Sequence, residues 1–404
     1  MKKKFDFHIV GAGFFGSVIA ERLANDLGLN ILIIDKRNHI GGNCFSEIDF
    51  ETGIEYHKYG THIFHTSNYK VMKYLLKFCE LNNYKHQVFS KYREQIYSLP
   101  FNLLTINQIY KKNLNPDEAK KLIKKETSKI QFLETDNLKN KALLTVGPKI
   151  YQKLIKGYTT KQWGKDPKFL PQSIINRIPL RFNFNSDYFL NSKWQGIPLN
   201  GYTDIFKKML SNKNITIKLN KEFCLNDLNS NVPTLYTGPL DSLLNYKYGS
   251  LEWRSLKFKK KIIKKMDFQG NSVINYSDIK TRHTRIHEPK HLHPERNYTS
   301  KKTLIIHEYP SADNKNPYYP INDKKNRQIH RKYKKLLKEY KNFYYGGRLA
   351  DYAYYDMDMT ISAALQLYEN KIKKIFNNKP KSNLLIKTLY LFKIKLSQIK
   401  KKSQ

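Results

Sequence analysis

Three glycines near the N-terminus, Gly11, Gly13 and Gly16, have a spacing that indicates phosphate chemistry. An apolar run at 7–10 precedes them, a stretch of helical character follows, and a second apolar run ends in Asp35. In a dinucleotide-binding turn the first glycine makes the tight bend, the second lets the backbone approach a pyrophosphate, and the third lets the helix pack on the strand. The helix N-terminus would face the phosphates, and Asp35 would hold a ribose hydroxyl. The pattern predicts a bound dinucleotide.

The residues after Asp35 indicate which dinucleotide this is. The chain continues through Lys36 into a second glycine pair, Gly41 and Gly42, followed by Asn43. A nicotinamide enzyme rarely needs such a pair, whereas an enzyme that buries extended FAD can use it to bring the backbone against the flavin end. An ordinary loop is the alternative, but beside the first glycine motif the pair favours FAD.

A second candidate anion contact lies near the C-terminus, where an aromatic run at 343–345 leads into two glycines and Arg348. A guanidinium after such a turn could reach the pyrophosphate, and a helix expected from about Asp358 could direct its positive end at the flavin. Arginine is scarce beside lysine in this chain. Arginines kept at Arg177, Arg285 and Arg348 therefore indicate planar, bidentate contacts with an anion.

Composition limits the class of protein. At 404 residues the chain is too long for one core and suggests two or three domains, and its 40% hydrophobic content is typical of a globular protein. No run approaches the roughly 18 apolar residues of a membrane span. The lysines at 2–4 resemble the start of a signal peptide, but the apolar stretch behind them is short and broken by Asp6 and His8. Three cysteines without a paired metal spacing predict reduced thiols in a cytoplasmic protein and no metal site.

The net charge of +39 could serve a nucleic acid or an anionic membrane. Because lysine is spread along the whole chain, solvated lysine faces are the simpler interpretation, and no nucleic-acid partner is predicted. The segment 377–404 differs, since apolar residues are interspersed there with lysines and no acid follows Glu369. Such a basic amphipathic tail could make peripheral contact with an anionic bilayer. The alternatives are a solvated tail and a helix docked on the protein's own surface.

The elements that must position these residues change character along the chain. Helical periodicity covers 68–186, where Asn115 predicts an N-cap and residues 147–156 predict a helix closed by Gly157. Residues 246–310 predict an antiparallel sheet. The last strand and helix of the nucleotide-binding domain come only at the C-terminal end, so that domain must be discontinuous.

We therefore predict an α/β fold with a discontinuous Rossmann-like FAD-binding domain, an inserted helical domain and an antiparallel β-sheet domain. The expected boundaries are 1–80 with 197–245 and 325–376 for the FAD-binding domain, 81–185 for the helical domain, 186–196 with 246–324 for the sheet domain, and 377–404 for the tail. No internal repeat is visible in the sequence.

From residue 5 to about 376 the chain resembles the UDP-galactopyranose mutase family. The motifs that carry the resemblance are Lys36-Arg37-Asn38-His39-Ile40-Gly41-Gly42-Asn43, His57-Lys58-Tyr59-Gly60 with His62-Ile63-Phe64-His65-Thr66, Lys156-Gly157-Tyr158-Thr159 with Lys161-Gln162-Trp163-Gly164, Arg177-Ile178-Pro179, Gly238-Pro239, Pro317-Tyr318-Tyr319-Pro320 and Tyr354-Tyr355-Asp356-Met357. The resemblance implies an isomerase that converts UDP-galactopyranose to UDP-galactofuranose with no net redox change, using FAD that must be reduced. It further implies a covalent intermediate between N5 of the reduced flavin and the sugar, and a product used in cell-surface glycans.

The resemblance also assigns roles to residues. It implies catalytic roles for Arg177 and Arg285 on the diphosphate and for His62 against the flavin. The implied cofactor-binding residues are Gly11, Gly13, Phe14, Gly16, Asp35, Lys36, Gly42, Asn43, His62, Ile63, Arg348, Tyr355, Asp356 and Met357. The implied substrate-binding residues are His86, Leu154, Tyr158, Thr159, Trp163, Arg177, Tyr188, Asn275, Arg285, Glu308, Tyr319 and Tyr354. A UDP-sugar substrate and a homodimer are further implications, and each single residue keeps a structural interpretation as a strand histidine or a core aromatic.

Departures from the family's pattern leave the exact sugar open. Leu154 and Ile155 replace an aromatic pair that packs on the uracil, and His86 stands where the family has asparagine. Thr61 occupies a position near the sugar that usually holds a smaller or imino residue, so UDP-N-acetylgalactosamine is an alternative substrate. Alternatives from other classes are a non-catalytic basic flavoprotein that binds membrane or nucleic acid, and a flavin amine oxidase. The paired arginines and tyrosines favour the mutase, because they call for an anionic substrate.

Overall fold

The computed structural model describes residues 4–177, except 131–136, and residues 179–377, except 314–315. Its first unit is a five-stranded parallel sheet in the order β16-β10-β1-β2-β9. The strands are β1 Phe7–Val10, β2 Ile31–Ile34, β9 Ile215–Lys218, β10 Thr234–Tyr236 and β16 Phe343–Tyr345. The two strands predicted on either side of the glycine turn are confirmed, as is the predicted fold class.

Helices cover both faces of the parallel sheet, as its largely apolar strands require. Helices α1, α2, α7 and α10 share a core with one face, and α8 and α9 share a core with the other. The helices of this unit are α1 Phe14–Leu27, α2 Tyr69–Leu75, α7 Gly201–Met209, α8 Leu240–Leu243, α9 Lys324–Leu337, α10 Met357–Leu367 and α11 Lys373–Asn377. The helix expected from about Asp358 is confirmed, with Ile361 fully buried in the first of these cores.

The turn between β1 and α1 requires two of its glycines for packing. Gly11 has a φ of 111°, and a Cβ at this position would lie 2.0 Å from Thr237 Oγ1. A Cβ on Gly16 would lie 2.0 Å from the carbonyl oxygen of Gly11, so the helix approaches the strand as predicted. A Cβ on Gly13 would meet nothing closer than Gly42 Cα, at 3.7 Å. The protein itself therefore does not need a glycine at position 13.

A second sheet has seven strands in the order β15-β11-β14-β13-β12-β6-β7, and only the β12–β6 pair is parallel. Its strands are β6 Val88–Tyr92, β7 Gln95–Leu99, β11 Trp253–Ile263, β12 Val273–Tyr276, β13 Arg285–His287, β14 Thr303–Ser311 and β15 Tyr319–Pro320. The antiparallel sheet predicted over 246–310 is confirmed. The prediction of helical character over 68–186 is wrong at β6 and β7. These residues form a hairpin whose partner β12 is remote in sequence, and local periodicity does not reveal such a pairing.

Four helices, α3–α6, pack around an apolar core of their own. They are α3 Leu103–Tyr110, α4 Pro116–Ser128, α5 Leu138–Ile150 and α6 Gly157–Trp163. Asn115 forms the predicted N-cap of α4 in a reciprocal contact with Glu118. The predicted helix end at Gly157 is wrong, because Gly157 has a helical φ of −66° and the chain ends this helix at Gly164, with φ 65°. Gly157 serves packing instead, since a Cβ there would lie 2.2 Å from the carbonyl oxygen of Ser277.

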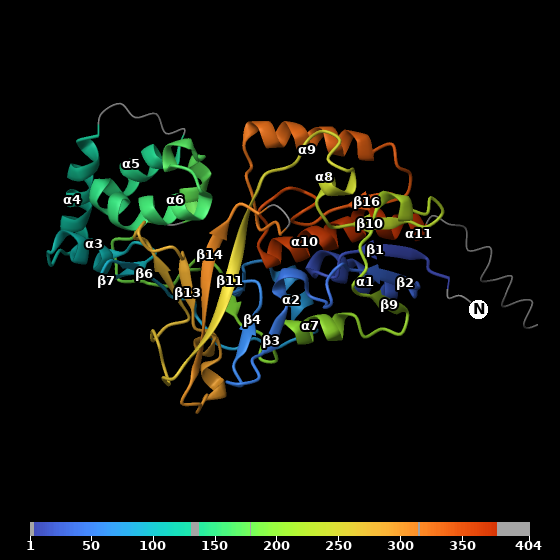
Figure 1. Ribbon diagram of the computed structural model, residues 1–404, viewed down its shortest axis with the longest axis horizontal. Coiled ribbons are helices and arrows are strands. Elements are labelled where there is room, and N and C mark those ends of the chain that lie inside the picture. The colour runs from blue at the N-terminus through green and yellow to red at the C-terminus, as the bar shows by residue number, and fades with distance from the viewer. Residues whose placement is uncertain (1–3, 131–136, 178, 314–315, 378–404) are drawn as a thin grey trace, which may run out of the picture.

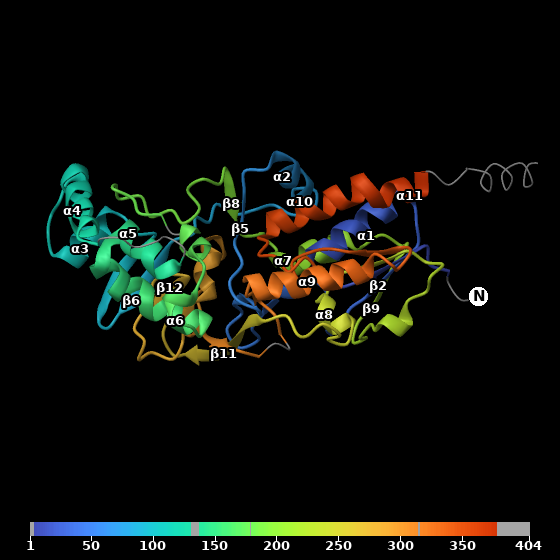
Figure 2. The same ribbon diagram turned by 90° about the horizontal axis from the view of Figure 1, so that it is seen from above.

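Figures 1 and 2 place α3–α6 at one end of an elongated molecule and the parallel sheet with its helices at the other. The antiparallel strands lie between these ends (Figure 1). Two small antiparallel pairs complete the described fold, β3 Ser46–Ile48 with β4 Glu55–His57 and β5 Phe64–Thr66 with β8 Trp194–Gly196. Within the described ranges, no helix has the length and apolar character needed to cross a bilayer. The tail predicted at 377–404 lies outside the described residues after Asn377.

We expect Gly16→Ala to destabilise the fold even without a bound ligand. The new Cβ would collide with the Gly11 carbonyl and contact the Ile9 side chain, and overpacking of this kind costs about 1–3 kcal/mol. Urea unfolding of the ligand-free protein measures the loss. Gly13→Ala is the matched control, because Gly13 has a φ of −82° and open space around it. Equal losses in the two variants would contradict this explanation of the turn.

Candidate active site

A cavity of about 950 Å³ lies between the two sheets and takes residues from both. The parallel sheet contributes the turns at the carboxyl ends of β1, β2 and β10, the edge at which doubly wound sheets bind ligands. The second sheet contributes Asn275, Arg285 and Glu308, which are paired across β12, β13 and β14. Ligand sites usually have roughly 300–1,000 Å³, so this one can hold an elongated ligand.

The residues predicted to bind the cofactor all line this cavity. They are Gly11, Gly13, Phe14, Gly16, Asp35, Lys36, Gly42, Asn43, His62, Ile63, Arg348, Tyr355, Asp356 and Met357. The Asp35 carboxylate accepts N–H bonds from Ala12 at 2.8 Å and from Arg37 at 2.9 Å, which fixes it at the end of β2. A carboxylate has about four acceptor positions, so two remain for a ribose.

Arg348 supplies an unsatisfied donor to the cavity. Its guanidinium donates to the carbonyl oxygens of Tyr355, at 3.3 Å, and Tyr318, and lies over the rings of Tyr319 and Tyr354 at 5.4 and 4.5 Å from their centroids. Its Nε is buried without a hydrogen-bond partner among the described residues. A buried, unpartnered N–H of a cation is costly unless an anion binds it. Together with the glycine turn, Arg348 fits the pyrophosphate of a dinucleotide.

The structure adds Arg37 and Tyr59, to which the sequence assigned no role. Arg37 donates to Asn43 Oδ1 at 2.8 Å, and its guanidinium lies 4.3 Å from the ring centroid of Tyr59. Arg37 and Tyr59 both line the cavity. The scarcity of arginine, which singled out the other site arginines, could also have found Arg37.

His62 is held by backbone groups on two sides. Its Nδ1 lies 2.6 Å from the carbonyl oxygen of Gly60, and its backbone N–H donates to His57 Nδ1 at 2.9 Å. Burial lowers the pKa of His62 to about 4, with the Gly60 bond opposing the shift and the Arg348 charge adding to it. The imidazole is therefore neutral at pH 7. Because a carbonyl oxygen only accepts, the proton is on Nδ1, and Nε2 is an acceptor.

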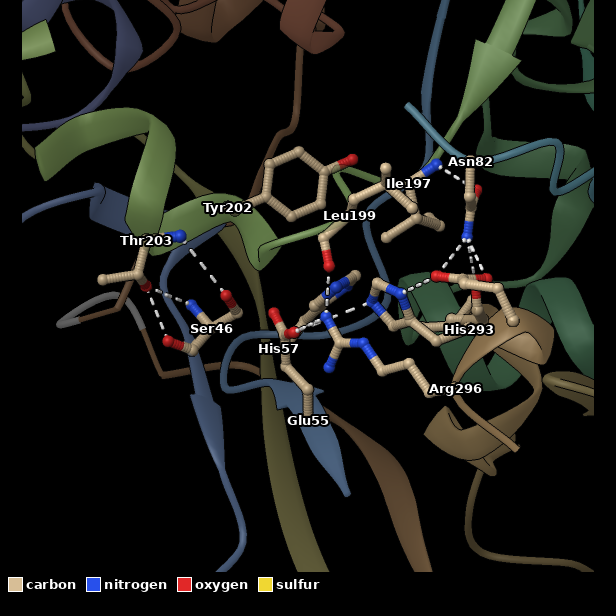
Figure 3. A network of polar contacts seen from close by, with 12 residues as sticks. Ser46, Glu55, His57, Asn82, Ile197, Leu199, Tyr202, Thr203, His293 and Arg296 are labelled. Atoms are coloured by element: carbon tan, nitrogen blue, oxygen red, sulfur yellow. Dashed lines mark hydrogen bonds and ion pairs between the residues drawn. The ribbon is translucent and has the colours of Figure 1, made fainter. Parts of the chain in front are cut away.

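Figure 3 shows the polar network around His57. The Glu55 carboxylate pairs with Arg296 at 2.6 Å and lies 3.7 Å from His293 Nε2, and Arg296 also donates to the carbonyl oxygen of Leu199 at 2.6 Å. Burial lowers the pKa of His57 well below its usual value, and the nearby imidazoles and Arg296 act in the same direction. His57 therefore stays neutral, and its Nδ1 can accept the hydrogen bond from the backbone N–H of His62.

Arg285 is oriented by neighbouring strands of the second sheet. Its Nε donates to Asn275 Oδ1 at 3.2 Å, and its Nη1 donates to Glu308 Oε2 at 3.4 Å. Glu308 also accepts from Thr284 Oγ1 at 3.0 Å and lies 3.1 Å from His287 Nε2. Burial alone would raise the pKa of Glu308, but Arg285 and His287 hold it at about 2, so the carboxylate is charged. Other N–H groups of Arg285 remain for an anion in the cavity.

His287 connects this cluster to Thr61, the residue whose type left the identity of the substrate sugar undecided from the sequence. Thr61 Oγ1 lies 2.7 Å from His287 Nδ1, and both residues line the cavity. The sequence assigned no role to His287. The signal was its position two residues after Arg285, because alternate residues of a strand face the same side.

Aromatic side chains complete the walls of the cavity. Tyr319 and Tyr354 stack with 5.6 Å between centroids and 7° between planes, and His86 meets Tyr188 edge to face at 5.4 Å. Burial lowers the pKa of His86 to about 3 and raises the pKa of Tyr319. The Tyr319 phenol is therefore protonated and can donate to a phosphate. These four residues line the cavity as predicted.

Residues predicted from the helical segment do not line the cavity. Leu154 is buried in the core of α3–α6, and Thr159 is also buried. Trp163 packs against the same core, with its ring centroid 6.3 Å from that of Tyr319. Leu154 lies away from the cavity because this part of the chain buries its apolar side chains against one another.

Tyr158 and Arg177 need separate mention. The Arg285 guanidinium lies 5.8 Å from the ring centroid of Tyr158, so Tyr158 stands next to the cavity. Its hydroxyl is buried without a hydrogen-bond partner among the residues described. Arg177 ends the short 3-10 helix Gln172–Arg177, and its side chain lies outside the described part of the structure.

The fold and the site define an enzyme that binds a dinucleotide and an anionic substrate in one cavity. The model of the family described as UDP-galactopyranose mutase matches residues 153–354, and that of an NAD(P)-binding Rossmann-like domain matches residues 9–78. A probable UDP-galactopyranose mutase of Klebsiella pneumoniae is 39% identical over 91% of this chain and 95% of its own length. The chain belongs to the UDP-galactopyranose mutase family and is a flavoprotein isomerase.

Further relatives agree with this membership. A dTDP-fucopyranose mutase of Escherichia coli is 38% identical over 92% of this chain and 98% of its own length. A UDP-galactopyranose mutase of Mycoplasma genitalium is 36% identical over 90% and 93% of the two chains. The crystal structure of a reduced UDP-galactopyranose mutase superimposes with a TM-score of 0.69 at 13% identity, covering 91% of this chain and 96% of that one, which supports the fold.

We expect Gly13→Ala to weaken flavin binding while leaving the fold intact. Its Cβ would occupy the space that the structure leaves open beside Gly42, where the backbone would approach the pyrophosphate. The expected loss is about tenfold in affinity, which corresponds to ~1.4 kcal/mol. Titration of flavin-free protein with FAD, followed by flavin fluorescence, measures it. Unchanged affinity would mean that the pyrophosphate does not lie against this turn.

Proposed function

We propose that this protein converts UDP-galactopyranose to UDP-galactofuranose with bound FAD that must be reduced. The observation that carries the proposal is Arg285, which Asn275 and Glu308 orient in the same cavity as the glycine turn. A guanidinium fixed in this way can bind the diphosphate of a nucleotide sugar beside a flavin. The names of the Klebsiella and Mycoplasma relatives support this substrate.

Two features support FAD as the dinucleotide. A Cβ on Gly42 would lie 3.0 Å from Gly13 Cα, so the second glycine pair packs closely against the first glycine turn. The cavity is narrow at this point and suits a ligand bound in an extended conformation. Tyr355, Asp356 and Met357 line the cavity where α10 begins. The positive N-terminal end of this helix would therefore face the bound flavin.

Reduced FAD would supply the nucleophile, N5, that holds the sugar covalently while UDP leaves. The side chains of the protein would stabilise the departing diphosphate, with Arg285 and Arg177 providing charge and Tyr319 and Tyr354 donating hydroxyls. His62 contributes a neutral acceptor at Nε2, so it adds no positive charge beside the flavin.

The identity of the sugar nucleotide stays part of the proposal. The Escherichia coli relative is named for dTDP-fucopyranose, which supports a deoxysugar nucleotide as the second candidate. UDP-N-acetylgalactosamine remains the alternative raised by Thr61. Reduced protein given each of the three furanose nucleotides separately, with chromatography of the products, decides between them.

Other parts of the proposal rest on the sequence alone. They are a cytoplasmic location, a homodimer, use of the product in galactofuranose-containing cell-surface glycans, and peripheral membrane contact through 377–404. No nucleic-acid partner is proposed.

We expect the oxidised protein to be nearly inert and the dithionite-reduced protein to be active without stoichiometric consumption of reductant. N5 of an oxidised flavin is electrophilic and cannot attack an anomeric carbon, whereas the isomerisation itself changes no oxidation state. Conversion of UDP-galactofuranose, followed by chromatography, measures the difference. Full turnover by oxidised protein without any reductant would falsify the proposal.

We expect Arg285→Ala and Arg177→Ala each to lower activity by about 10²-fold or more, the usual effect of removing one charge-stabilising donor. Lysine should rescue poorly at either position, because an ammonium lacks the planar fork of donors. Flavin content should remain normal in every variant. Arg282→Ala, at an exposed position near Arg285, is the control. Turnover like the parent protein's in either alanine variant would remove that arginine from the site.

A further inference from the structure

Helix α6 is bonded to the loop that leads into Arg285. Lys161 Nζ donates to the carbonyl oxygens of Tyr276 at 2.7 Å, Thr281 at 2.9 Å and His283 at 3.0 Å. An ammonium has three donors, and here a backbone carbonyl takes each of them. Burial lowers the pKa of Lys161 to about 8, which still leaves it largely charged at pH 7. The lysine therefore closes the β12–β13 loop immediately before the site arginine.

A second cation bonds the end of α6 to β11. Arg254 Nε donates to the carbonyl oxygen of Gln162 at 3.0 Å, and its Nη2 donates to that of Lys161 at 3.4 Å. These carbonyls belong to the last turn of the helix, where a cation is favoured. The backbone of Arg254 is opposite Tyr319 in the β11–β15 pair. One residue thus links the helix end to a tyrosine of the cavity wall.

Besides these hydrogen bonds, α6 packs closely against the second sheet and its β12–β13 loop. A Cβ on Gly157 would lie 2.2 Å from the carbonyl oxygen of Ser277, and a Cβ on Gly164 would lie 2.9 Å from Arg254 Nη1. Both ends of α6 therefore touch the second sheet through glycines. A helix packed at its first residue on the Ser277 backbone, just after its last residue on the Arg254 side chain, and bonded through Lys161 has little freedom to shift.

We propose that Lys161 and Arg254 are positioning residues that fix Tyr158, on α6, against Arg285. The contact between these two is the 5.8 Å approach of the guanidinium to the tyrosine ring centroid, and the buried Tyr158 hydroxyl has no hydrogen-bond partner among the residues described. The inference rests on the proposed function, because it assigns the Tyr158 hydroxyl and Arg285 to the same diphosphate. Loss of the Lys161 bonds would let the two donors drift apart and weaken UDP binding in the ground state.

The test uses the flavin-loaded full chain with Lys161→Met, which keeps the length of the side chain and removes all three donors. Lys161→Arg keeps the charge but not the tetrahedral arrangement of donors. Lys156→Met, at an exposed position just before α6, is the matched control. Amide hydrogen exchange without substrate is measured over 157–164 and 276–285, and UDP affinity and steady-state constants are measured separately.

We expect faster exchange in both segments, about tenfold weaker UDP binding, and a higher KM with a smaller change in kcat for Lys161→Met. Lys161→Arg should restore little, and the control should match the parent protein. If Lys161→Met leaves amide exchange unchanged, Lys161 does not fix α6 and the proposal is overturned. If exchange becomes faster while UDP affinity stays the same, Lys161 does not position the groups that bind UDP. If the parent protein itself fails to bind UDP, the proposed function fails, while the exchange data still judge the contact.

Discussion

The active-site cavity depends on one ion pair, between the buried Glu55 and the half-buried Arg296, at the junction of the two sheets. Glu55 belongs to β4, which follows the second glycine pair, and Arg296 follows β13 of the other sheet. Arg296 also bonds to Leu199 just before α7, so three segments that are distant in sequence meet at one guanidinium. Removing the Arg296 charge would leave the Glu55 carboxylate buried without its cation, which costs up to about 3–5 kcal/mol. A Cβ on Gly201 would lie 1.9 Å from Glu55 Oε1, so the start of α7 packs directly against this carboxylate.

Burial decides which histidines near the cavity carry charge. Burial keeps His57, His62 and His86 neutral, and each keeps its position through hydrogen bonds. The arginines of the cavity carry fixed positive charge, because their guanidinium groups stay ionised in a low-dielectric site. An anionic substrate therefore meets fixed cations and neutral acceptors, an arrangement that needs little reorganisation as charge develops.

The Glu308 carboxylate offsets part of the positive charge of Arg285, and we explain its presence by the orientation that it gives to the guanidinium. A buried anion next to the arginine that we propose binds the diphosphate would oppose the substrate's charge, and a surface lysine would avoid that conflict. However, a flexible lysine, of which this +39 chain has many, would not hold its charged group in one fixed orientation. Pairing Arg285 with Glu308 and Asn275 sacrifices part of its charge and fixes the plane of its guanidinium.

The sequence by itself determined the β1–turn–α1–β2 unit with Asp35, the cap at Asn115 and the strands of 246–310. Each depends on neighbouring residues, through backbone angles, capping or alternation. Most of the site residues that it named line the cavity, because family motifs identify them one by one. Only the tertiary structure decided that 88–99 joins a sheet, that Gly157 serves a close contact, that Leu154 belongs to a core, and that His287 joins Thr61 to Glu308. These facts rest on contacts between residues far apart in the chain, which packing selects and local pattern does not encode.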